Sequence, residues 1–88
     1  MKRSLLYVLT AKAIPVPPGC SGVLHLHLTL RAGAKGTGRL IATNTCLATA
    51  KDYRAAVWEI AADVKRRHGI LPAWILNHGP FSVLREEN

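Results

Sequence analysis

Two histidines, His25 and His27, are separated by one residue, a spacing that places both imidazoles on the same side of a β-strand. Imidazoles in that arrangement can share a metal ion, but a zinc site needs at least one further protein ligand. His68, His78 or Cys46 would have to come close through folding. We therefore expect His25 and His27 to be solvated strand residues that enlarge a basic surface, and we expect no metal.

A glycine-rich hexapeptide, Gly-Ala-Lys-Gly-Thr-Gly at residues 33–38, has the composition of a phosphate-binding loop. The Walker pattern ends in Gly-Lys-Ser/Thr and opens a helix. Here Lys35 precedes Gly36, and a strand is expected to follow. We predict a hairpin loop instead, in which backbone amides together with Lys35 and Arg39 are available to a phosphate.

The densest basic cluster, Lys-Arg-Arg-His at residues 65–68, falls at the end of a predicted helix. Cations there complement the helix dipole, so the cluster does not require nucleic acid to explain it. Trp58 falls on the flank of the same helix, beside Arg54 and Lys65. Tryptophan beside arginine is typical of interface hot spots, although a tryptophan is more often a core-edge residue.

Residues for catalysis are scarce. The first 51 residues contain no carboxylate, and the later acids fall at the helix start, on its solvent face or in residues 85–88. Cys20 lies in a loop of proline and glycine and is most simply interpreted as a loop thiol. It is far from Cys46 in the sequence, and two thiols make neither a disulfide framework nor a zinc site. With no assembled acid, base and nucleophile, we expect a protein without enzymatic activity or cofactor.

The net charge of +7 arises entirely within the first 51 residues, which hold seven lysines and arginines and no acid. In the remainder, five acids balance five bases. A lopsided field of this kind attracts anionic partners and speeds their encounter. We expect a partner-binding surface drawn from Lys12, His25, His27, Arg31, Lys35, Arg39, Arg54, Trp58, Lys65 and Arg66.

The length of 88 residues and the 49% hydrophobic content indicate one folded domain over residues 1–88. No apolar run approaches the roughly 20 residues of a transmembrane helix, so no membrane contact is expected. Residues 1–13 have the basic start, the apolar stretch and the Ala-x-Ala ending of a signal peptide, but they are shorter than is usual. We expect a first strand there, with a signal peptide as the alternative.

Apolar periodicity and turn residues predict the order β-β-β-α-β-β. In residues 23–31 leucines alternate with polar residues, which is the clearest strand signal. The helix is expected to start at a capping motif in residues 49–52 and to stop at Gly69. The predicted elements are strands over 4–12, 23–31 and 39–47, a helix over 51–68, and short strands over 73–76 and 81–84.

The predicted fold class is α+β, an antiparallel sheet with one helix packed on one face. A single helical turn over residues 72–76 is the alternative to the fourth strand. One face of the helix is apolar at helical spacing and should pack on the sheet: Tyr53, Val57, Ile60, Ala61 and Val64. The first strand is apolar on both faces, which suggests a sheet face buried against a partner or a second copy in a homodimer.

This order of elements resembles that of certain small phage-encoded anti-CRISPR proteins directed at type I systems. The resemblance covers the alternating strand 23–31, the glycine-rich hairpin, the helix 51–68 and the ending over 73–84. It implies a stoichiometric blocker of a CRISPR surveillance complex in the cytoplasm of the host cell, with no catalytic residues.

The expected partner is therefore an acidic protein surface or a ribonucleoprotein complex. The alternative is a basic protein that contacts the phosphate backbone of DNA or RNA. Only one aromatic residue, Tyr7, precedes Tyr53, so the sequence does not support stacking of single-stranded bases on the sheet.

Overall fold

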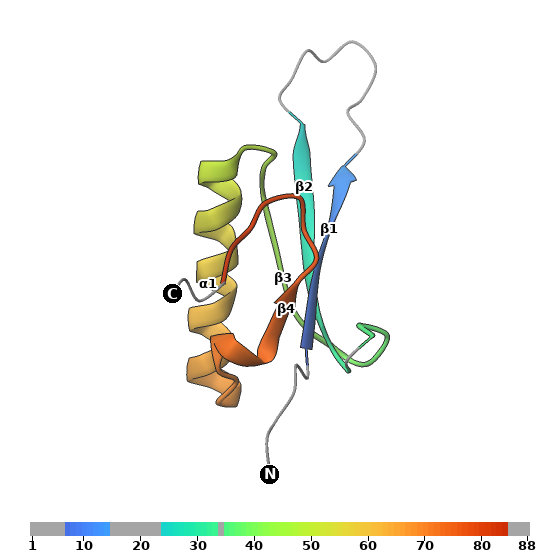
Figure 1. Cartoon of the computed structure of the whole chain (residues 1–88), viewed down its shortest axis with the longest axis vertical. Helices are drawn as coiled ribbons and strands as arrows, with labels where there is room; N and C mark the ends of the chain where they lie inside the picture. The colour runs from blue at the N-terminus through green and yellow to red at the C-terminus, as the bar shows by residue number, and fades with distance from the viewer. Residues whose placement is uncertain (1–6, 15–23, 34, 85–88) are drawn as a thin grey trace.

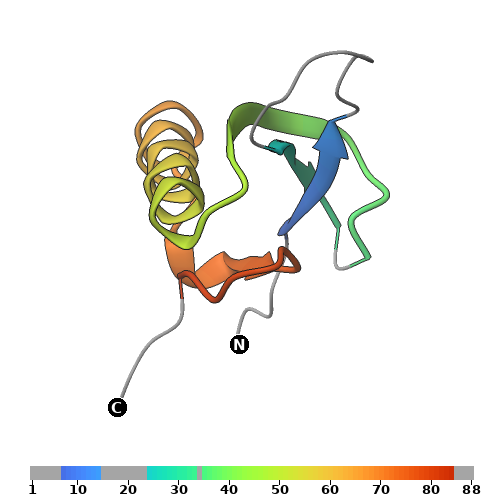
Figure 2. The same cartoon turned by 90° about the horizontal axis from the view of Figure 1, so that it is seen from above.

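The computed structural model describes residues 7–14, 24–33 and 35–84. They form a four-stranded sheet in the order β3-β2-β1-β4, with one helix, α1, packed on one face (Figures 1 and 2). This confirms the predicted α+β class and the single helix. The elements are β1 Tyr7–Ile14, β2 His25–Ala32, β3 Leu40–Leu47, α1 Ala50–His68, a 3-10 turn Pro72–Trp74 and β4 Ile75–Asn77.

Strand β2 lies in the interior of the sheet and pairs antiparallel with both β1 and β3. Its leucines Leu26, Leu28 and Leu30 are buried on the side of α1, whereas His27 and Arg31 are exposed on the other side. The predicted alternation is thus confirmed. Because successive residues of a strand point to opposite faces, this single strand fixes which face of the sheet is dry.

The helix begins and ends at the residues that the sequence predicts for its caps. Thr49 is the N-cap, and its Oγ1 accepts a hydrogen bond from the backbone N–H of Asp52 at 3.2 Å. Gly69 adopts φ +70° and donates its N–H to the Lys65 carbonyl, a left-handed ending that glycine favours. Among the described residues no helix is both long and apolar enough to cross a membrane.

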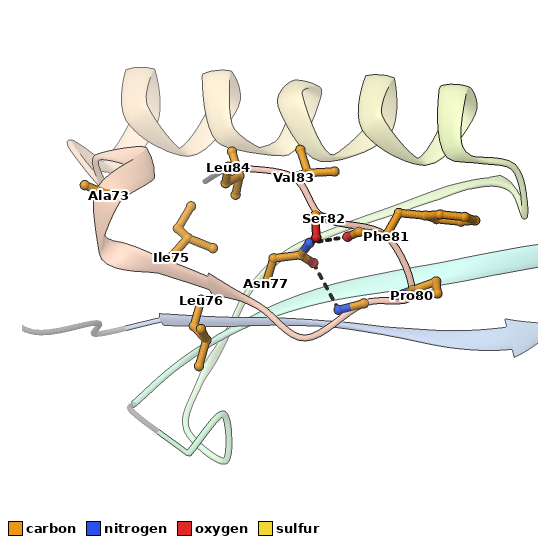
Figure 3. Close-up of a pocket in the computed structure, with 10 residues that line it drawn as sticks. Ala73, Ile75, Leu76, Asn77, Pro80, Phe81, Ser82, Val83 and Leu84 are labelled. Carbon is orange, nitrogen blue, oxygen red and sulfur yellow. Dashed lines mark hydrogen bonds between the residues drawn. The ribbon is translucent and has the colours of Figure 1, made fainter. Parts of the chain in front are cut away.

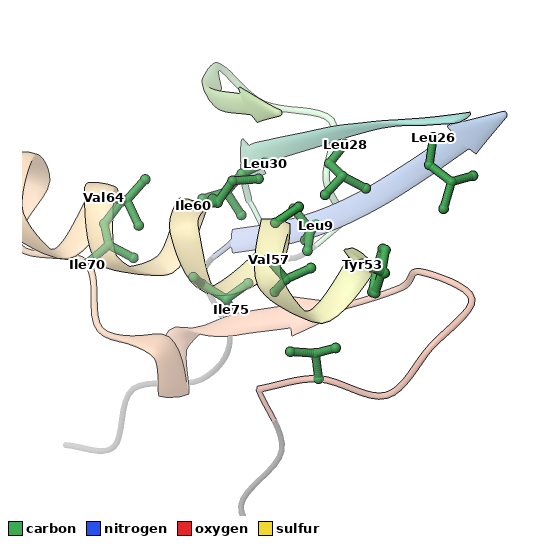
Figure 4. Close-up of a cluster of buried hydrophobic side chains, with 12 residues drawn as sticks. Leu9, Leu26, Leu28, Leu30, Tyr53, Val57, Ile60, Val64, Ile70 and Ile75 are labelled. Atoms are coloured by element: carbon green, nitrogen blue, oxygen red, sulfur yellow. The ribbon is translucent and has the colours of Figure 1, made fainter. Parts of the chain in front are cut away.

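The core lies between α1 and the adjacent sheet face (Figure 4). The predicted helix stripe, Tyr53, Val57, Ile60, Ala61 and Val64, is buried in full. It packs with the leucines of β2 and with residues from the other strands and the C-terminal segment. Burying each large aliphatic side chain contributes about 1.5–3 kcal/mol, so this one interface supplies most of the stabilising burial.

The prediction of a fully antiparallel sheet is wrong in one respect, because β4 pairs parallel with β1. Strands β1 and β3 run in the same direction, since each is antiparallel to β2. The helix returns the chain along the sheet, so the strand that follows it runs in the direction of β1. The single helical turn that was the alternative for this region is also present, as the 3-10 turn before β4.

The predicted fifth strand over residues 81–84 is also wrong, since this segment forms no strand. Asn77 holds it in another way. Its Oδ1 accepts hydrogen bonds from the Tyr53 hydroxyl at 2.5 Å and from the Gly79 N–H at 3.0 Å, and its Nδ2 donates to the Phe81 carbonyl at 2.6 Å. The segment therefore turns back onto the core, where Val83 is buried.

A second asparagine ties the edge strand β3 to the helix. The Nδ2 of Asn44 donates to the Ala56 carbonyl at 3.2 Å and to Glu59 Oε1 at 3.0 Å. Its Oδ1 accepts the backbone N–H of Thr45 at 2.8 Å. Glu59 was expected to point away from the sheet; it is exposed, but it reaches toward β3 through this contact.

Gly79 lies directly against Tyr53, and a Cβ atom there would overlap the tyrosine hydroxyl and ring. We expect Gly79→Ala to lower the free energy of unfolding by about 3 kcal/mol, as overpacking of a fixed core contact does. Urea unfolding followed by circular dichroism measures the change. Gly69→Ala is the control, because no atom lies near that position and only its left-handed backbone opposes a side chain, at about 1 kcal/mol. Equal losses for the two variants would contradict the packing role of Gly79.

Tyr53 is fully buried, and burial raises the pKa of its hydroxyl to about 12, with a smaller contribution from the nearby Cys46. In the unfolded chain the hydroxyl loses its proton near pH 10. Between pH 10 and 12 the unfolded state therefore binds fewer protons than the folded state, and stability falls as pH rises.

We expect this group to remove about 2–3 kcal/mol of stability between pH 9 and pH 12. The measurement is the free energy of unfolding across that range for the wild type and for Tyr53→Phe. The variant keeps the ring and lacks the titrating hydroxyl, so subtracting its curve cancels the contribution of lysines. Parallel curves for the two proteins would contradict the assignment.

Candidate functional site

In the described part of the chain, one face of the sheet carries no helix, and we call it the open face (Figure 2). The register of the strands sets its outward side chains in rows that run across β1, β2 and β3. Rows follow one another at about 7 Å, two residues along a strand. From the end near the β2–β3 loop, the rows are Val8–Arg31–Leu40, Thr10–Thr29–Thr43, Lys12–His27–Thr45 and Ile14–His25–Leu47.

The open face is positively charged and contains no acid among its outward residues. Lys12 and His27 lie directly opposite each other on neighbouring strands, and both are exposed, as are His25 and Arg31. The acids of the described part of the chain all lie on α1, beyond the sheet: Asp52, Glu59 and Asp63. Four of the predicted partner-binding residues are thus brought together on one surface.

The β2–β3 loop folds over one end of this face and forms a raised rim. Arg31 donates from Nη1 to the Gly38 carbonyl at 3.0 Å. Gly36 lies on Val8, where an added Cβ would come within 3.0 Å of the valine Cβ. Lys35 and Arg39 are exposed in this loop, so both predicted residues lie at the rim.

The same contact explains an apolar residue on the outer side of β1. Val8 is only 2% exposed although it points away from the helix, because the β2–β3 loop covers it. Leu5 and Leu6, which contributed to the expectation of a homodimer, lie outside the described residues. Val8 therefore needs no second copy for its burial, and the oligomeric state stays a prediction.

Hydroxyl groups fill the middle of the open face, and the list of predicted site residues missed them. The Oγ1 atoms of Thr10 and Thr29 are hydrogen bonded at 3.0 Å, and Thr43 continues the row on β3. Thr45 extends the next row. Thr43 and Thr45 occupy alternate positions of a predicted strand, and this spacing could have indicated that both hydroxyls lie on one face. The prediction was based on charged residues, and hydroxyl groups carry no charge.

Three further predicted residues lie on the other side of the molecule. Arg54, Trp58 and Lys65 follow one another at helical spacing on α1, on the flank opposite the contacts with Asn44 of β3. We call them the Trp58 flank. Trp58 is 45% exposed. Because α1 and the sheet separate this flank from the open face, one flat partner surface cannot contact both.

Arg66, the last predicted residue, belongs to neither surface. Its Nη2 lies 2.8 Å from Asp63 Oδ1, and Nε of Arg67 lies 3.0 Å from the same oxygen. Arg66 lines a groove of about 430 Å³ between α1 and β3 together with Asp63 and Glu59. Exposed pairs of this kind contribute little stability, and the neighbouring acids offset the charge of Arg66 for an anionic partner.

The residues considered as metal ligands do not converge. His25 and His27 lie on the open face, whereas His68 ends α1 and His78 follows β4. In the part of the chain that the structure describes, no three histidine, cysteine or acidic side chains are grouped as a metal site would require.

The thiol of Cys46 lies on the helix side of β3. Burial, and then the negative charge of Asp52, raise the pKa of this thiol, which disfavours the nucleophilic thiolate. Cys20 lies outside the described residues.

A hollow of about 560 Å³ lies between β4 and the returning segment over residues 79–84 (Figure 3). Its lining contains no charged side chain. Asn77, the main polar group in it, already uses both ends of its amide in internal hydrogen bonds. The hollow therefore offers the Ser82 hydroxyl but no acid or base beside it, and the open face is the stronger candidate.

The open face thus stands as a candidate site on charge and geometry within this chain. No protein-family model, no curated protein and no solved structure matches the sequence or the fold.

Proposed function

We propose that the protein is a non-enzymatic binding protein that uses its open face to cover an anionic surface of a host protein or ribonucleoprotein complex. The observation that carries the proposal is the exposure of Lys12, His25, His27 and Arg31 on one sheet face that holds no acid. Opposite charge on the partner would steer the encounter and set the orientation.

Such a protein acts by occupying a surface, so its effect is stoichiometric. The resemblance in element order to anti-CRISPR proteins makes a type I CRISPR surveillance complex the first partner to test. Its guide RNA and the target DNA that it binds are both polyanions, and a basic face that covers either contact would block the complex.

The test uses two charge-matched double variants. Lys12→Glu with Arg31→Glu alters the open face, and Arg54→Glu with Lys65→Glu alters the Trp58 flank. Each pair replaces one lysine and one arginine, which lowers the formal net charge of +7 by four units. Any difference between the pairs therefore reports position and not total charge.

We expect the wild type to inhibit target-DNA binding by a purified type I surveillance complex at near-equimolar ratio. The open-face variant should inhibit at least tenfold less, which corresponds to about 1.4 kcal/mol. The Trp58-flank variant should differ from the wild type by less than threefold. An unaffected complex at a large molar excess would refute this partner, and equal losses for the two variants would refute the open face as the contact surface.

Direct binding of nucleic acid is the second candidate, and the row of threonine hydroxyls beside Lys12 and His27 favours it. Hydroxyls and cationic side chains are the groups that most often contact phosphate oxygens in protein–DNA complexes. The two candidates share one surface and differ in whether the anion is presented by a complex or by the nucleic acid alone.

A further inference from the structure

All five aromatic side chains of the protein lie away from the open face. Tyr53 is fully buried beneath α1. Three others pack at the edge of the same core, and Trp58 is exposed on the helix flank. Since the whole chain contains two tryptophans, two tyrosines and one phenylalanine, this accounts for every one of them. The three at the core edge are Tyr7, Trp74 and Phe81.

This placement decides what kind of nucleic acid the face can hold. Proteins that bind single strands stack bases on aromatic side chains, and each stacked base contributes about 1–3 kcal/mol. The open face offers no stacking surface. Its outward polar groups are hydroxyls, imidazoles, an ammonium and a guanidinium, which suit phosphate oxygens.

Within the proposed anionic surface, the same composition favours a nucleic-acid component over a protein component. Hot spots of protein interfaces are enriched in Trp, Tyr and Arg, and the fully buried centre of such interfaces is depleted in charge. Here the centre holds threonine, histidine and lysine, and the apolar residues Ile14, Leu40 and Leu47 lie at the corners. A composition of the hot-spot kind occurs on the Trp58 flank instead.

We propose that the open face binds the sugar–phosphate backbone of double-stranded nucleic acid without reading its base sequence. This inference rests on the proposed function of the open face and specifies its ligand. A duplex presents one fixed charge per about 1.7 Å of its axis. A single strand must be ordered on the face and receives no stacking in return.

The layout of charge on the face suits an extended backbone. Lys12, with the His27 imidazole opposite it, forms one donor position, and Arg31 with the rim residues Lys35 and Arg39 forms another. His27 and Arg31 are four positions apart along β2, a distance of about 13 Å. The hydroxyls of Thr10 and Thr29 lie between the two positions, so a backbone crossing the face would meet donors along its whole path.

The experiment measures fluorescence anisotropy of labelled 24-mers of mixed sequence: duplex DNA, duplex RNA and the matching single strands, at 50 to 200 mM salt. We expect duplexes to bind at least tenfold more tightly than single strands, with little change when the sequence is scrambled. Lys12→Glu with Arg31→Glu should weaken duplex binding at least tenfold and reduce the salt slope by about 2, one per lost phosphate contact. Arg54→Glu with Lys65→Glu should change it less than threefold.

A gain of function completes the test. Thr43 is exposed at the β3 end of the threonine row on the open face, and Thr43→Phe supplies the missing stacking surface. We expect this variant to bind single strands several-fold more tightly than the wild type, with duplex affinity nearly unchanged. Thermal unfolding of each variant by circular dichroism verifies that the fold is retained.

The outcomes separate the inference from the function on which it rests. Single strands bound as tightly as duplexes would refute duplex recognition while leaving an anion-binding face. Failure to bind any nucleic acid at 50 mM salt, with inhibition of the surveillance complex retained and lost in the open-face variant, would refute duplex recognition in favour of an acidic protein partner. Failure of both would refute the proposed function as well.

Discussion

With one helix available, a four-stranded sheet can keep only one of its faces dry, and this constraint governs the described part of the chain. The leucines of β2 and the apolar stripe of α1 must meet on that side. A polar group is also buried on this side: the Tyr53 hydroxyl can lie in the core because Asn77 accepts its hydrogen bond. A buried hydroxyl without a partner would cost about 1–3 kcal/mol. The open face is what remains once this requirement is met, so its polarity follows from the fold before any partner is considered.

The elements that the sequence predicted well are those set by local signals. Strict alternation identified β2, and Thr49 and Gly69 marked the ends of α1. The direction of β4 depends on where the helix returns the chain, which is not a local property. Residues 81–84 have the apolar character of a strand, but the amide of Asn77 takes the Phe81 carbonyl and directs the segment back to the core. Nothing in the residues around Asn77 reveals a partner 24 positions away.

The positive charge of the candidate site could be predicted from the sequence, but which of the predicted residues share one surface could not. Lys12, His25, His27 and Arg31 could be assigned to outward positions from alternation alone. Whether the Trp58 flank lies on the same surface depends on which face of the sheet α1 covers. The helix covers the face of the β2 leucines, so the Trp58 flank and the open face are on opposite sides of the molecule. The threonines between the cations were missed because their contribution is hydrogen bonding and geometry, which a charge count does not register.

Asn44 has a consequence for how the sheet meets other chains. β3 is an edge strand, and unpaired backbone groups on an edge invite a further strand, from a peptide or from another copy in an aggregate. Ala48 donates its N–H to the carbonyl of Leu24, the residue before β2. Since the N–H groups of a strand point alternately to its two sides, the N–H of Thr45 points away from β2, where it donates to Asn44 Oδ1. One outward N–H in the middle of this edge is therefore already occupied, which disfavours strand addition there. For a strongly basic chain, this leaves the side chains of the open face, and not the backbone of this edge, as the groups available to a partner under the proposed function.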